Sequence, residues 1–259
     1  MVDDRERIDA FLRWTHESTS TRVETSVYGT AFYNDDFPGR WDGNFLRVER
    51  PIDATVEQLV AETNRLFEGF AHREIVILDE AAGARLAASF ERDGWEVDRL
   101  VFMVQRREAD RTSNSAVEEC SFEEIRPLTV EVNLHSHGTT TLTSAEMLAD
   151  FRGTLVDALD ARFFAARVDG ELAGSCELYI HEEVAEIEDV HTLERFRGRG
   201  VARAVVGRAV LEARDRGADL IFLSADDADW PKELYAKLGF DPTSRFWQFT
   251  KPPEGESYR

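Results

Sequence analysis

The sequence of 259 residues predicts a mixed α/β fold, in which helices cover the faces of a mixed β-sheet. Short apolar runs rich in β-branched and aromatic residues predict strands. Longer stretches with apolar residues three and four positions apart predict amphipathic helices between those strands. In the second part of the chain a three-strand meander precedes helix, strand, helix and strand, an order typical of a mixed sheet with helices packed on it.

The elements of the second part can be placed in chain order. Asp169 and Gly170 form a dipeptide typical of a hairpin turn, and they separate the first two strands. A long helix is expected from Val201, because apolar residues recur there at helical spacing, and Gly217 is placed to end it. A short helix and a turn are expected at 230–240. The expected strands lie at residues 161–168, 172–180, 184–192, 218–225 and 245–251.

An internal repeat relates the two parts of the chain. Residues 73–104 and 219–249 both read strand, short helix, aromatic residue, three further residues, glycine, aromatic residue and strand. The first aromatic residue is Phe90 in the earlier copy and Tyr235 in the later one. Similarity of order and spacing over about 30 residues indicates a duplicated unit.

A polar segment at 105–120 carries little apolar periodicity and is interpreted as a linker. We therefore expect a first domain at residues 1–107, a linker at 108–120 and a second domain at 121–259. The earlier unit lacks the arginine- and glycine-rich turn that the later one carries before its long helix. The duplication is therefore expected to have kept the scaffold and lost this loop in the first domain.

The charge balance of the chain is strongly acidic. Asp and Glu number 51 against 31 Lys and Arg, a formal net charge of −20, and only three of the basic residues are lysines. An acid-rich surface with few lysines is typical of halophilic proteins, because salt screens the repulsion between carboxylates. A preference for acidic residues without that cause is the alternative. Either origin disfavours a nucleic-acid-binding protein, because phosphate contacts need a basic face.

Cysteine usage and the absence of targeting signals predict a cytoplasmic protein. Cys120 and Cys176 are the only cysteines, and they form no CxxC pair, which predicts neither a zinc knuckle nor a disulfide framework. The N-terminal residues are acidic and polar, without the basic and apolar regions of a signal peptide. No apolar stretch approaches the roughly 20 residues that span a bilayer.

The arginine- and glycine-rich turn before the long helix has the chemistry of an anion site. Backbone N–H groups at a helix start have no internal partners, and the helix dipole adds partial positive charge there. Gly198 and Gly200 leave the backbone accessible to a diphosphate. Arg197, Arg199 and Arg203 supply guanidinium groups that suit phosphate oxygens. The alternative is that these arginines pair with surface acids. The turn matches neither a P-loop nor the dinucleotide-binding GxGxxG pattern.

Two motifs carry a resemblance to a known family. The stretch "EDVHTLERFRGRGVA" resembles the cofactor motif of the GCN5-related N-acetyltransferases (GNAT), in which R-x-x-G-x-G/A follows a strand, and Arg197, Gly200 and Ala202 occupy its marked positions. The stretch "ELYAKLGF" resembles the second motif of that family, a helix that bears Tyr and ends in Leu-Gly-Phe. The resemblance covers residues 122–252. Over about the first 105 residues it is faint and resembles a degenerate copy, as in tandem acetyltransferases with one silent half.

The resemblance implies a GNAT fold that binds acetyl-CoA as co-substrate and no metal. The pantetheine arm would pair with the backbone of residues 190–192, where the central strand splays from its neighbour. The diphosphate would lie on the turn and the helix start. The implied cofactor-binding residues are Val190, His191, Thr192, Arg197, Gly198, Arg199, Gly200, Val201, Ala202 and Arg203.

A catalytic base is sought among the acids of the strand at 184–192, because an ammonium group must lose a proton before it attacks. Strict alternation of side chains places Glu186, Glu188 and Val190 on one face and Asp189 with His191 on the other. Glu188 matches the position at which some polyamine acetyltransferases carry a glutamate near the amine. We assign Glu188 as the base, directly or through a water, with Glu186 as a second candidate. The alternative is that these acids are ordinary solvated residues.

Tyr235 matches the general acid of the family, and a phenol is protonated at neutral pH and can donate to the leaving thiolate. The alternative is a core aromatic residue. Phe90 at the matching position favours the general acid, because packing alone tolerates Phe and the copy that lacks the cofactor loop also lacks the hydroxyl. One departure from the family is Ala228, seven residues before Tyr235, where the family often carries an Asn that touches the cofactor.

His135 and His137 form a pair without further ligands, and we expect a polar loop there and not a metal site.

Together these features predict an N-acetyltransferase that moves acetyl from acetyl-CoA directly to an amine. A non-catalytic acyl-CoA-binding regulatory module is the alternative. The sequence does not identify the acceptor, a small molecule or a peptide, nor say whether the first domain covers a sheet edge or shapes the acceptor cleft. It also leaves open a monomer, with two fused units as a pseudo-dimer, or a homodimer.

Overall fold

The computed structural model describes residues 3–112, 115–135 and 141–253. The helices in these residues are α1 (Asp4–Thr19), α2 (Val56–Leu66), α3 (Glu80–Arg92), α4 (Phe122–His135), α5 (Leu142–Leu159), α6 (Val201–Asp215) and α7 (Pro231–Lys237). The strands are β1 (Arg22–Thr25), β2 (Thr30–Tyr33), β3 (Phe45–Val48), β4 (Arg73–Ile77), β5 (Glu96–Gln105), β6 (Val117–Cys120), β7 (Arg162–Val168), β8 (Glu171–His181), β9 (Val184–Thr192), β10 (Leu220–Asp226) and β11 (Phe240–Lys251).

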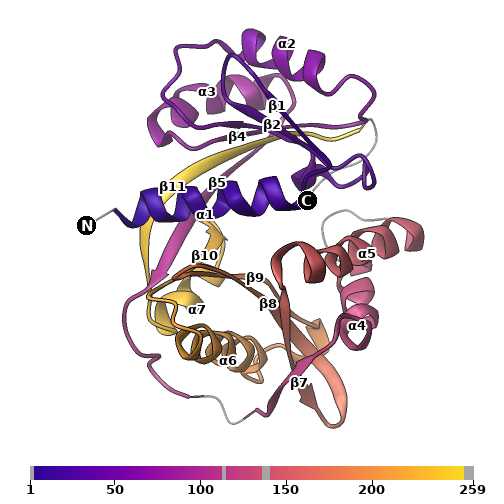
Figure 1. The fold of residues 1–259 in the computed structure, drawn as a ribbon, viewed down its shortest axis with the longest axis vertical. Coiled ribbons are helices and arrows are strands. Elements are labelled where there is room, and N and C mark those ends of the chain that lie inside the picture. The colour runs from indigo at the N-terminus through magenta and orange to yellow at the C-terminus, as the bar shows by residue number, and fades with distance from the viewer. Residues whose placement is uncertain (1–2, 113–114, 136–140, 254–259) are drawn as a thin grey trace.

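All of these strands belong to one mixed sheet, which confirms the predicted fold class. Its strand order is β1-β2-β3-β4-β11-β5-β10-β9-β8-β7-β6. We call residues 3–112 the N-terminal half and residues 115–253 the C-terminal half. The last strand of each half pairs with the other half, since β11 lies between β4 and β5, and β5 pairs with β10. Figure 1 shows β5 and β11 running between the two halves, so the halves share one sheet.

The contact between β5 and β11 has the symmetry of a duplicated unit. In the antiparallel register Leu100 pairs with Phe246 and Val101 pairs with Arg245. These two pairs are reciprocal, because Leu100 and Val101 correspond to Arg245 and Phe246 in the repeat. The rings of Phe102 and Phe246 stack at 4.4 Å with 20° between their planes. When the same strand meets its copy across a two-fold axis, reciprocal pairs of this kind result. The predicted repeat accordingly corresponds to β4–α3–β5 and β10–α7–β11.

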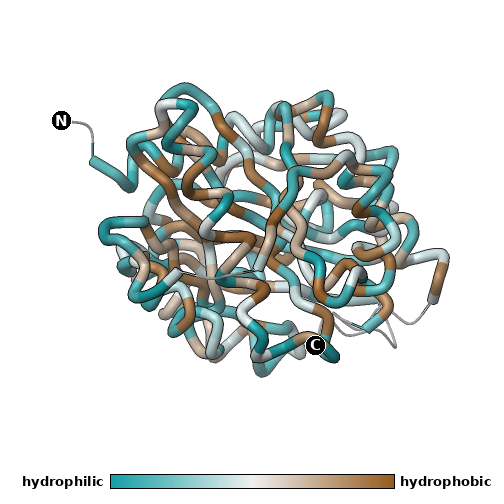
Figure 2. The backbone as a smooth tube through the Cα atoms, turned by 90° about the horizontal axis from the view of Figure 1, so that it is seen from below, coloured by the Kyte–Doolittle hydropathy of each residue, from teal (hydrophilic) through white to brown (hydrophobic). Residues whose placement is uncertain are grey.

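Helices cover both faces of the sheet, and α1 lies between the two halves (Figure 1). One face of the C-terminal half packs against α6 through Val205, Val206 and Ala209, as the helical spacing predicted. The other face packs against α1 and α5, and the ring of Phe11 meets Phe222 edge-on at 5.4 Å. In Figure 2 most of the hydrophobic, brown segments lie in the interior of the view and most of the hydrophilic, teal segments lie at its periphery.

The segment interpreted as a linker includes structure. Residues 117–120 form β6, which pairs with β7 at the edge of the sheet. The preceding part of the segment contacts the start of α6, because Asp110 forms an ion pair with Arg203. The borders of the two domains stay a prediction. Within the described ranges, no helix is long and apolar enough to cross a membrane.

Candidate active site

A cavity of about 910 Å³ lies beside the start of α6. Residues of β9, α6 and α7 line it, and Tyr235 is among them. The cavity also includes nine of the ten residues that the sequence implicated in cofactor binding, and only Arg199 is missing. These residues are Val190, His191, Thr192, Arg197, Gly198, Gly200, Val201, Ala202 and Arg203. We call this space the cofactor cavity.

The start of α6 is built as an open helix end. Gly198 and Gly200 have φ angles of 76° and 81°, a left-handed conformation that favours glycine. Gly200 is the N-cap residue, and no side chain caps the helix. Among the described residues the amides of Val201, Ala202 and Arg203 donate to no backbone or side-chain acceptor. Unsatisfied amides at a helix start are what a phosphate group requires.

The strands next to this helix diverge, as the family resemblance implied. Hydrogen-bonded pairing of β9 with β10 stops at Glu186 and Phe222, although β9 continues to Thr192 and β10 to Asp226. The backbone of residues 190–192 therefore has no partner strand on its β10 side. An extended ligand can pair with such a strand in the manner of an added strand.

The arginines of the turn divide into two groups. Arg197 lines the cofactor cavity. The guanidinium of Arg199 lies 3.2 Å from Asp169, outside the cavity lining. The Arg203 side chain is buried, 2.5 Å from Asp110 and 3.1 Å from the carbonyl oxygen of Arg111. Two of the three arginines thus pair with groups of the protein, as the alternative interpretation held, and the open amides remain the stronger anion-binding feature.

The expected alternation along β9 is wrong beyond Glu188, because the strand contains a bulge. Asp189 has a φ of 53°, and the register with β8 shifts between Ser175 and Glu177. An extra residue on one strand reverses which face the following side chains occupy. Val190 consequently packs with the core cluster on the α6 face of the sheet, opposite the face of Glu188.

The bulge brings Asp189 into a buried charge network. Arg152 of α5 lies 2.6 Å from Asp189 and 3.2 Å from Glu177, whose carboxylate also accepts a hydrogen bond from Tyr179. Burial raises the pKa of Glu177 to about 7, although Arg152 opposes this shift. Burial also opposes ionisation of Asp189, but Arg152 and His191 outweigh it and hold the pKa of this carboxyl well below its usual range. The network fixes the bulge that shapes β9.

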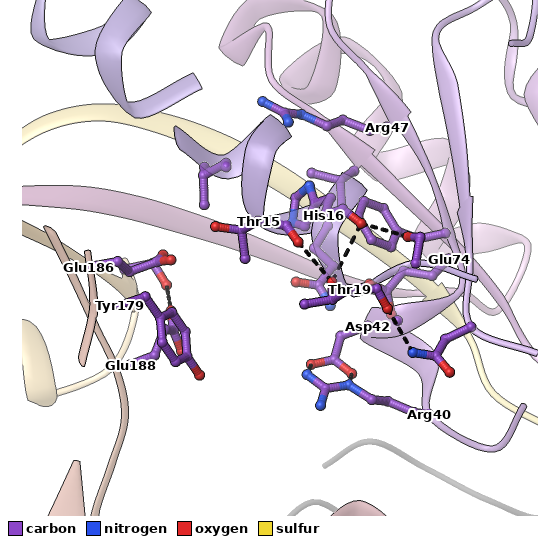
Figure 3. A pocket seen from close by; sticks show the side chains of 18 of the residues that line it. Thr15, His16, Thr19, Arg40, Asp42, Arg47, Glu74, Tyr179, Glu186 and Glu188 are labelled. Carbon is purple, nitrogen blue, oxygen red and sulfur yellow. Dashed lines mark hydrogen bonds and ion pairs between the residues drawn. The ribbon is translucent and has the colours of Figure 1, made fainter. Parts of the chain in front are cut away.

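A second cavity, of about 330 Å³, lies between the two halves. We call it the inter-half cavity. Glu186 and Glu188 of β9 line it from the C-terminal half, and His16, Asp42 and Glu74 are among the residues that line it from the N-terminal half. Figure 3 shows Glu186 and Glu188 on one side and the N-terminal-half residues on the other. The N-terminal half therefore forms part of the cavity into which the candidate base projects.

Glu188 has the environment of a carboxyl group that can exchange a proton. It accepts hydrogen bonds from the Asp189 amide at 3.2 Å and from the Ser224 hydroxyl at 3.4 Å. Burial raises the pKa of Glu188, and Arg152 only partly offsets this. Burial raises the pKa of Glu186 as well, together with the charge of Glu188 beside it and a hydrogen bond between the two carboxyls. A raised pKa brings a carboxylate closer to the range useful for a general base.

Tyr235 occupies the wall of the cofactor cavity and is 8 % exposed. Burial raises the pKa of its phenol well above the usual value, and the charge of Glu188 adds to this shift. The phenol is thus protonated at neutral pH, and its coupling to Glu188 indicates that the two cavities approach each other. Phe90, its counterpart in the N-terminal half, is fully buried and stacks on Phe249 at 4.3 Å.

The departure at Ala228 places other groups beside the cofactor cavity. The amide of Ala228 donates to the Asp226 carboxylate at 2.7 Å. The next two residues, Asp229 and the exposed Trp230, line the cavity. The side chain of the family's Asn has no counterpart here. Two residues that follow Ala228 nevertheless line the cofactor cavity.

Sequence reasoning missed Arg152, because no motif contains it. A signal was present, since Arg152 shares a helix face with Leu155 and Leu159, three and seven residues later. A charge on an apolar helix face indicates a buried partner.

His135 ends α4 and lines the cofactor cavity, whereas His137 lies outside the described residues. In the part of the chain that the structure describes, no group of three or more metal-ligating side chains is found.

Comparison with known proteins finds a family match over most of the residues that surround the cofactor cavity. Residues 125–240 match the model of the Acetyltransferase (GNAT) family. These residues form a GNAT domain. None of the curated proteins matches the chain.

Solved structures share the fold of the whole chain. A functionally unknown conserved protein from Staphylococcus epidermidis is similar with a TM-score of 0.71 and 14 % identity, over 90 % of this chain and 94 % of that one. A GCN5-related N-acetyltransferase from Kribbella flavida is similar with a TM-score of 0.63 and 18 % identity, over 97 % and 96 %. A tandem GNAT protein from the clavulanic acid biosynthesis pathway is similar with a TM-score of 0.55 and 12 % identity, over 87 % and 80 %. The GNAT fold in a tandem arrangement is thus shared, and the function is argued from the site.

Proposed function

We propose that the protein is an N-acetyltransferase that transfers an acetyl group from acetyl-CoA to an amine. The observation that carries the proposal is the open start of α6, whose amides line a cavity beside the unpaired edge of β9. A Cβ at Gly198 would meet no atom within 4 Å, so the turn leaves room for a diphosphate. The residues present therefore fit acetyl-CoA.

The chain's residues divide the chemistry between the two cavities. Acetyl-CoA supplies a thioester, an activated acyl group. Glu188, in the inter-half cavity, takes the proton from the acceptor ammonium, and Glu186 shares that proton. Tyr235, in the cofactor cavity, donates its proton to the leaving sulfur. The amide C–N bond forms and the thioester C–S bond breaks. The second proton of the reacting nitrogen restores the Tyr235 hydroxyl, the proton held at Glu188 passes to solvent, and the products are the N-acetyl amine and CoA.

The substitution Tyr235→Phe tests the proposal. Loss of the hydroxyl should lower kcat by about 10²- to 10⁴-fold, the usual worth of a general acid, while affinity for CoA is kept. Turnover is measured as thiol release from acetyl-CoA with a panel of amines, and CoA binding by calorimetry. Tyr28→Phe is the matched control, because Tyr28 is a half-buried tyrosine of the N-terminal half.

Two results would overturn the proposal. Failure of the wild-type protein to bind CoA would remove its basis in the helix start. Binding of acetyl-CoA without turnover of any amine in the panel would identify the non-catalytic binding module instead.

A further inference from the structure

The arginines that line the inter-half cavity are neutralised by the protein itself. Each has a carboxylate within ion-pair distance, so none of them needs an anionic group from a ligand. The pairs are Arg40 with Asp42 at 2.7 Å, Arg47 with Glu49 at 3.7 Å and Arg152 with Asp189 at 2.6 Å.

Three glutamates of the same cavity have no such compensation. Among the described residues, Glu74, Glu186 and Glu188 take part in no ion pair with an Arg, Lys or His side chain. Glu74 is 1 % exposed, and its Oε2 atom has no hydrogen-bond partner. A buried carboxyl without a cation is costly unless it is protonated or a ligand supplies the charge.

The uncompensated acids come from opposite sides of the cavity. Glu186 and Glu188 belong to β9 of the C-terminal half, and Glu74 belongs to β4 of the N-terminal half. In Figure 3 the two groups face each other across the space between the halves, with Asp42 on the side of Glu74. The cavity is thus acidic at two ends, and only the β9 end has the candidate base.

The raised pKa of Glu74 agrees with a carboxyl group that has no cation beside it. Burial raises the pKa of Glu74 well above its usual value, and the charge of Asp42 raises it further. A hydrogen bond from Gln248 and the charge of Arg40 oppose this shift without cancelling it, and the charge of Asp98 adds to it. An ammonium group placed beside Glu74 would reverse the shift and gain a charge-assisted hydrogen bond.

We infer that the acceptor is a short diamine, whose reacting amine lies at Glu188 and whose second, cationic end is bound by Glu74 of the N-terminal half. This inference rests on the proposed acetyl transfer. The transfer forms one amide C–N bond, breaks the thioester C–S bond and gives CoA and the monoacetyl diamine. The second ammonium takes no part in the chemistry and contributes binding energy alone. The N-terminal half would therefore set acceptor specificity.

The first test uses the wild-type protein and needs no variant. Diamines from 1,3-diaminopropane to 1,5-diaminopentane are compared with n-alkylamines of the same carbon number, which lack the second charge. A charge-assisted hydrogen bond should raise kcat/KM for at least one diamine about tenfold or more over its matched monoamine. Equal values across the series, with clear turnover, would overturn the inference and leave the proposed function standing.

The second test removes the charge at the distal end. Glu74→Gln keeps the side-chain shape and should lower the diamine-to-monoamine ratio of kcat/KM about tenfold, towards one. Glu68→Gln, at an exposed site of the N-terminal half outside the cavity, should keep the wild-type ratio. Calorimetric binding of CoA shows whether each variant is folded. An unchanged ratio in a folded Glu74→Gln protein would overturn the inference.

A binding measurement distinguishes failure of the proposed acetyl transfer from failure of the inference about the diamine. Titration of 1,5-diaminopentane into the wild-type protein without acetyl-CoA should show saturable binding that Glu74→Gln weakens. Absence of turnover of every amine would overturn the proposed function, even if the diamine binds. Absence of diamine binding together with turnover of monoamines would overturn the inference alone.

Discussion

The two halves of the molecule begin their equivalent helices in opposite ways. In the C-terminal half α6 starts at Gly200 without a side-chain cap. In the N-terminal half α2 starts at Thr55 with a capping box: the Thr55 hydroxyl accepts from the Gln58 amide at 3.3 Å, and the Gln58 side chain accepts from the Thr55 amide at 2.9 Å. A helix start binds an anion only when its amides are not already satisfied. The same scaffold therefore carries an open helix start, the proposed phosphate site, in one half and a closed helix start in the other.

The strands that precede these helices differ in a related way. In β9, Glu186 and Glu188 lie two residues apart and have no cationic partner among the described residues. In the equivalent place of the N-terminal half, Arg47 is followed two residues later by Glu49, and the two form an ion pair. At this place in the sheet the C-terminal half keeps acids with raised pKa values, whereas the N-terminal half pairs its acid with an arginine. Uncompensated charge and unsatisfied amides thus occur together in the half proposed to be catalytic.

The largest expected effect is that of substituting Glu188, which we compare with substitution of Glu49 at the equivalent place in the N-terminal half. Glu188→Gln should lower kcat by about 10²- to 10⁴-fold, because a general base is lost. The wild-type kcat should fall as the pH is lowered through the raised pKa of Glu188, since only the deprotonated carboxylate accepts a proton. Glu188→Gln should abolish this acidic limb in the pH profile of kcat.

Glu49→Gln is the counterpart in the N-terminal half. Glu49 pairs with Arg13 and Arg47, so its loss should lower the melting temperature and leave the acidic limb in place. Retention of the acidic limb in Glu188→Gln would show that another group is the base. A loss of that limb in Glu49→Gln would refute the division between the halves.

A smaller effect tests the start of α6 through Gly198, with Gly69, which follows the end of α2, as a control glycine of similar conformation. Gly198→Asp and Gly69→Asp each place a carboxylate at a positive φ, 76° and 95°, where a Cβ meets no atom within 4 Å. Only Gly198 lines the cofactor cavity. Repulsion between the new carboxylate and a diphosphate should weaken CoA binding about 100-fold in Gly198→Asp. Calorimetry on both variants measures this, and equal affinities would place the diphosphate elsewhere.

Local signals sufficed to predict the fold and the cofactor cavity. Asp169 and Gly170 at a hairpin, the apolar spacing after Val201 and the unshielded turn at Gly198 each act within a few residues of sequence. These features correspond to β7 and β8, α6 and the cavity beside it. Patterns whose physics is local can be interpreted from one sequence.

Other features could not be predicted because they depend on contacts distant in sequence. The bulge at Asp189 needs Arg152, 37 residues away, and simple alternation gives no sign of it. Pairing of Arg203 with Asp110 joins residues 93 positions apart. Placement of Glu74 opposite Glu188 depends on the exchange of β5 and β11 between the halves. Only the tertiary structure brings such groups together.

The smallest expected effect concerns the closed helix start. Thr55→Ala removes one side of the capping box and should cost about 1 kcal/mol of stability, a fall of roughly 2–4 °C in melting temperature for a protein of this size. Thr141→Ala is the matched control, because Thr141 caps α5 by accepting from the Ser144 amide at 3.1 Å. Thermal unfolding measures both changes.

Affinity for CoA should be unaffected by Thr55→Ala, and this is the sharper part of the test. The variant frees the Gln58 amide at the start of α2, yet it supplies neither the glycines of the α6 turn nor a cavity beside it. A single freed amide lacks the convergent donors that hold a diphosphate. If Thr55→Ala bound a second molecule of CoA per chain, the capping box alone would prevent CoA binding in the N-terminal half. The glycine turn and the cavity beside α6 would then not be needed to explain the difference between the halves.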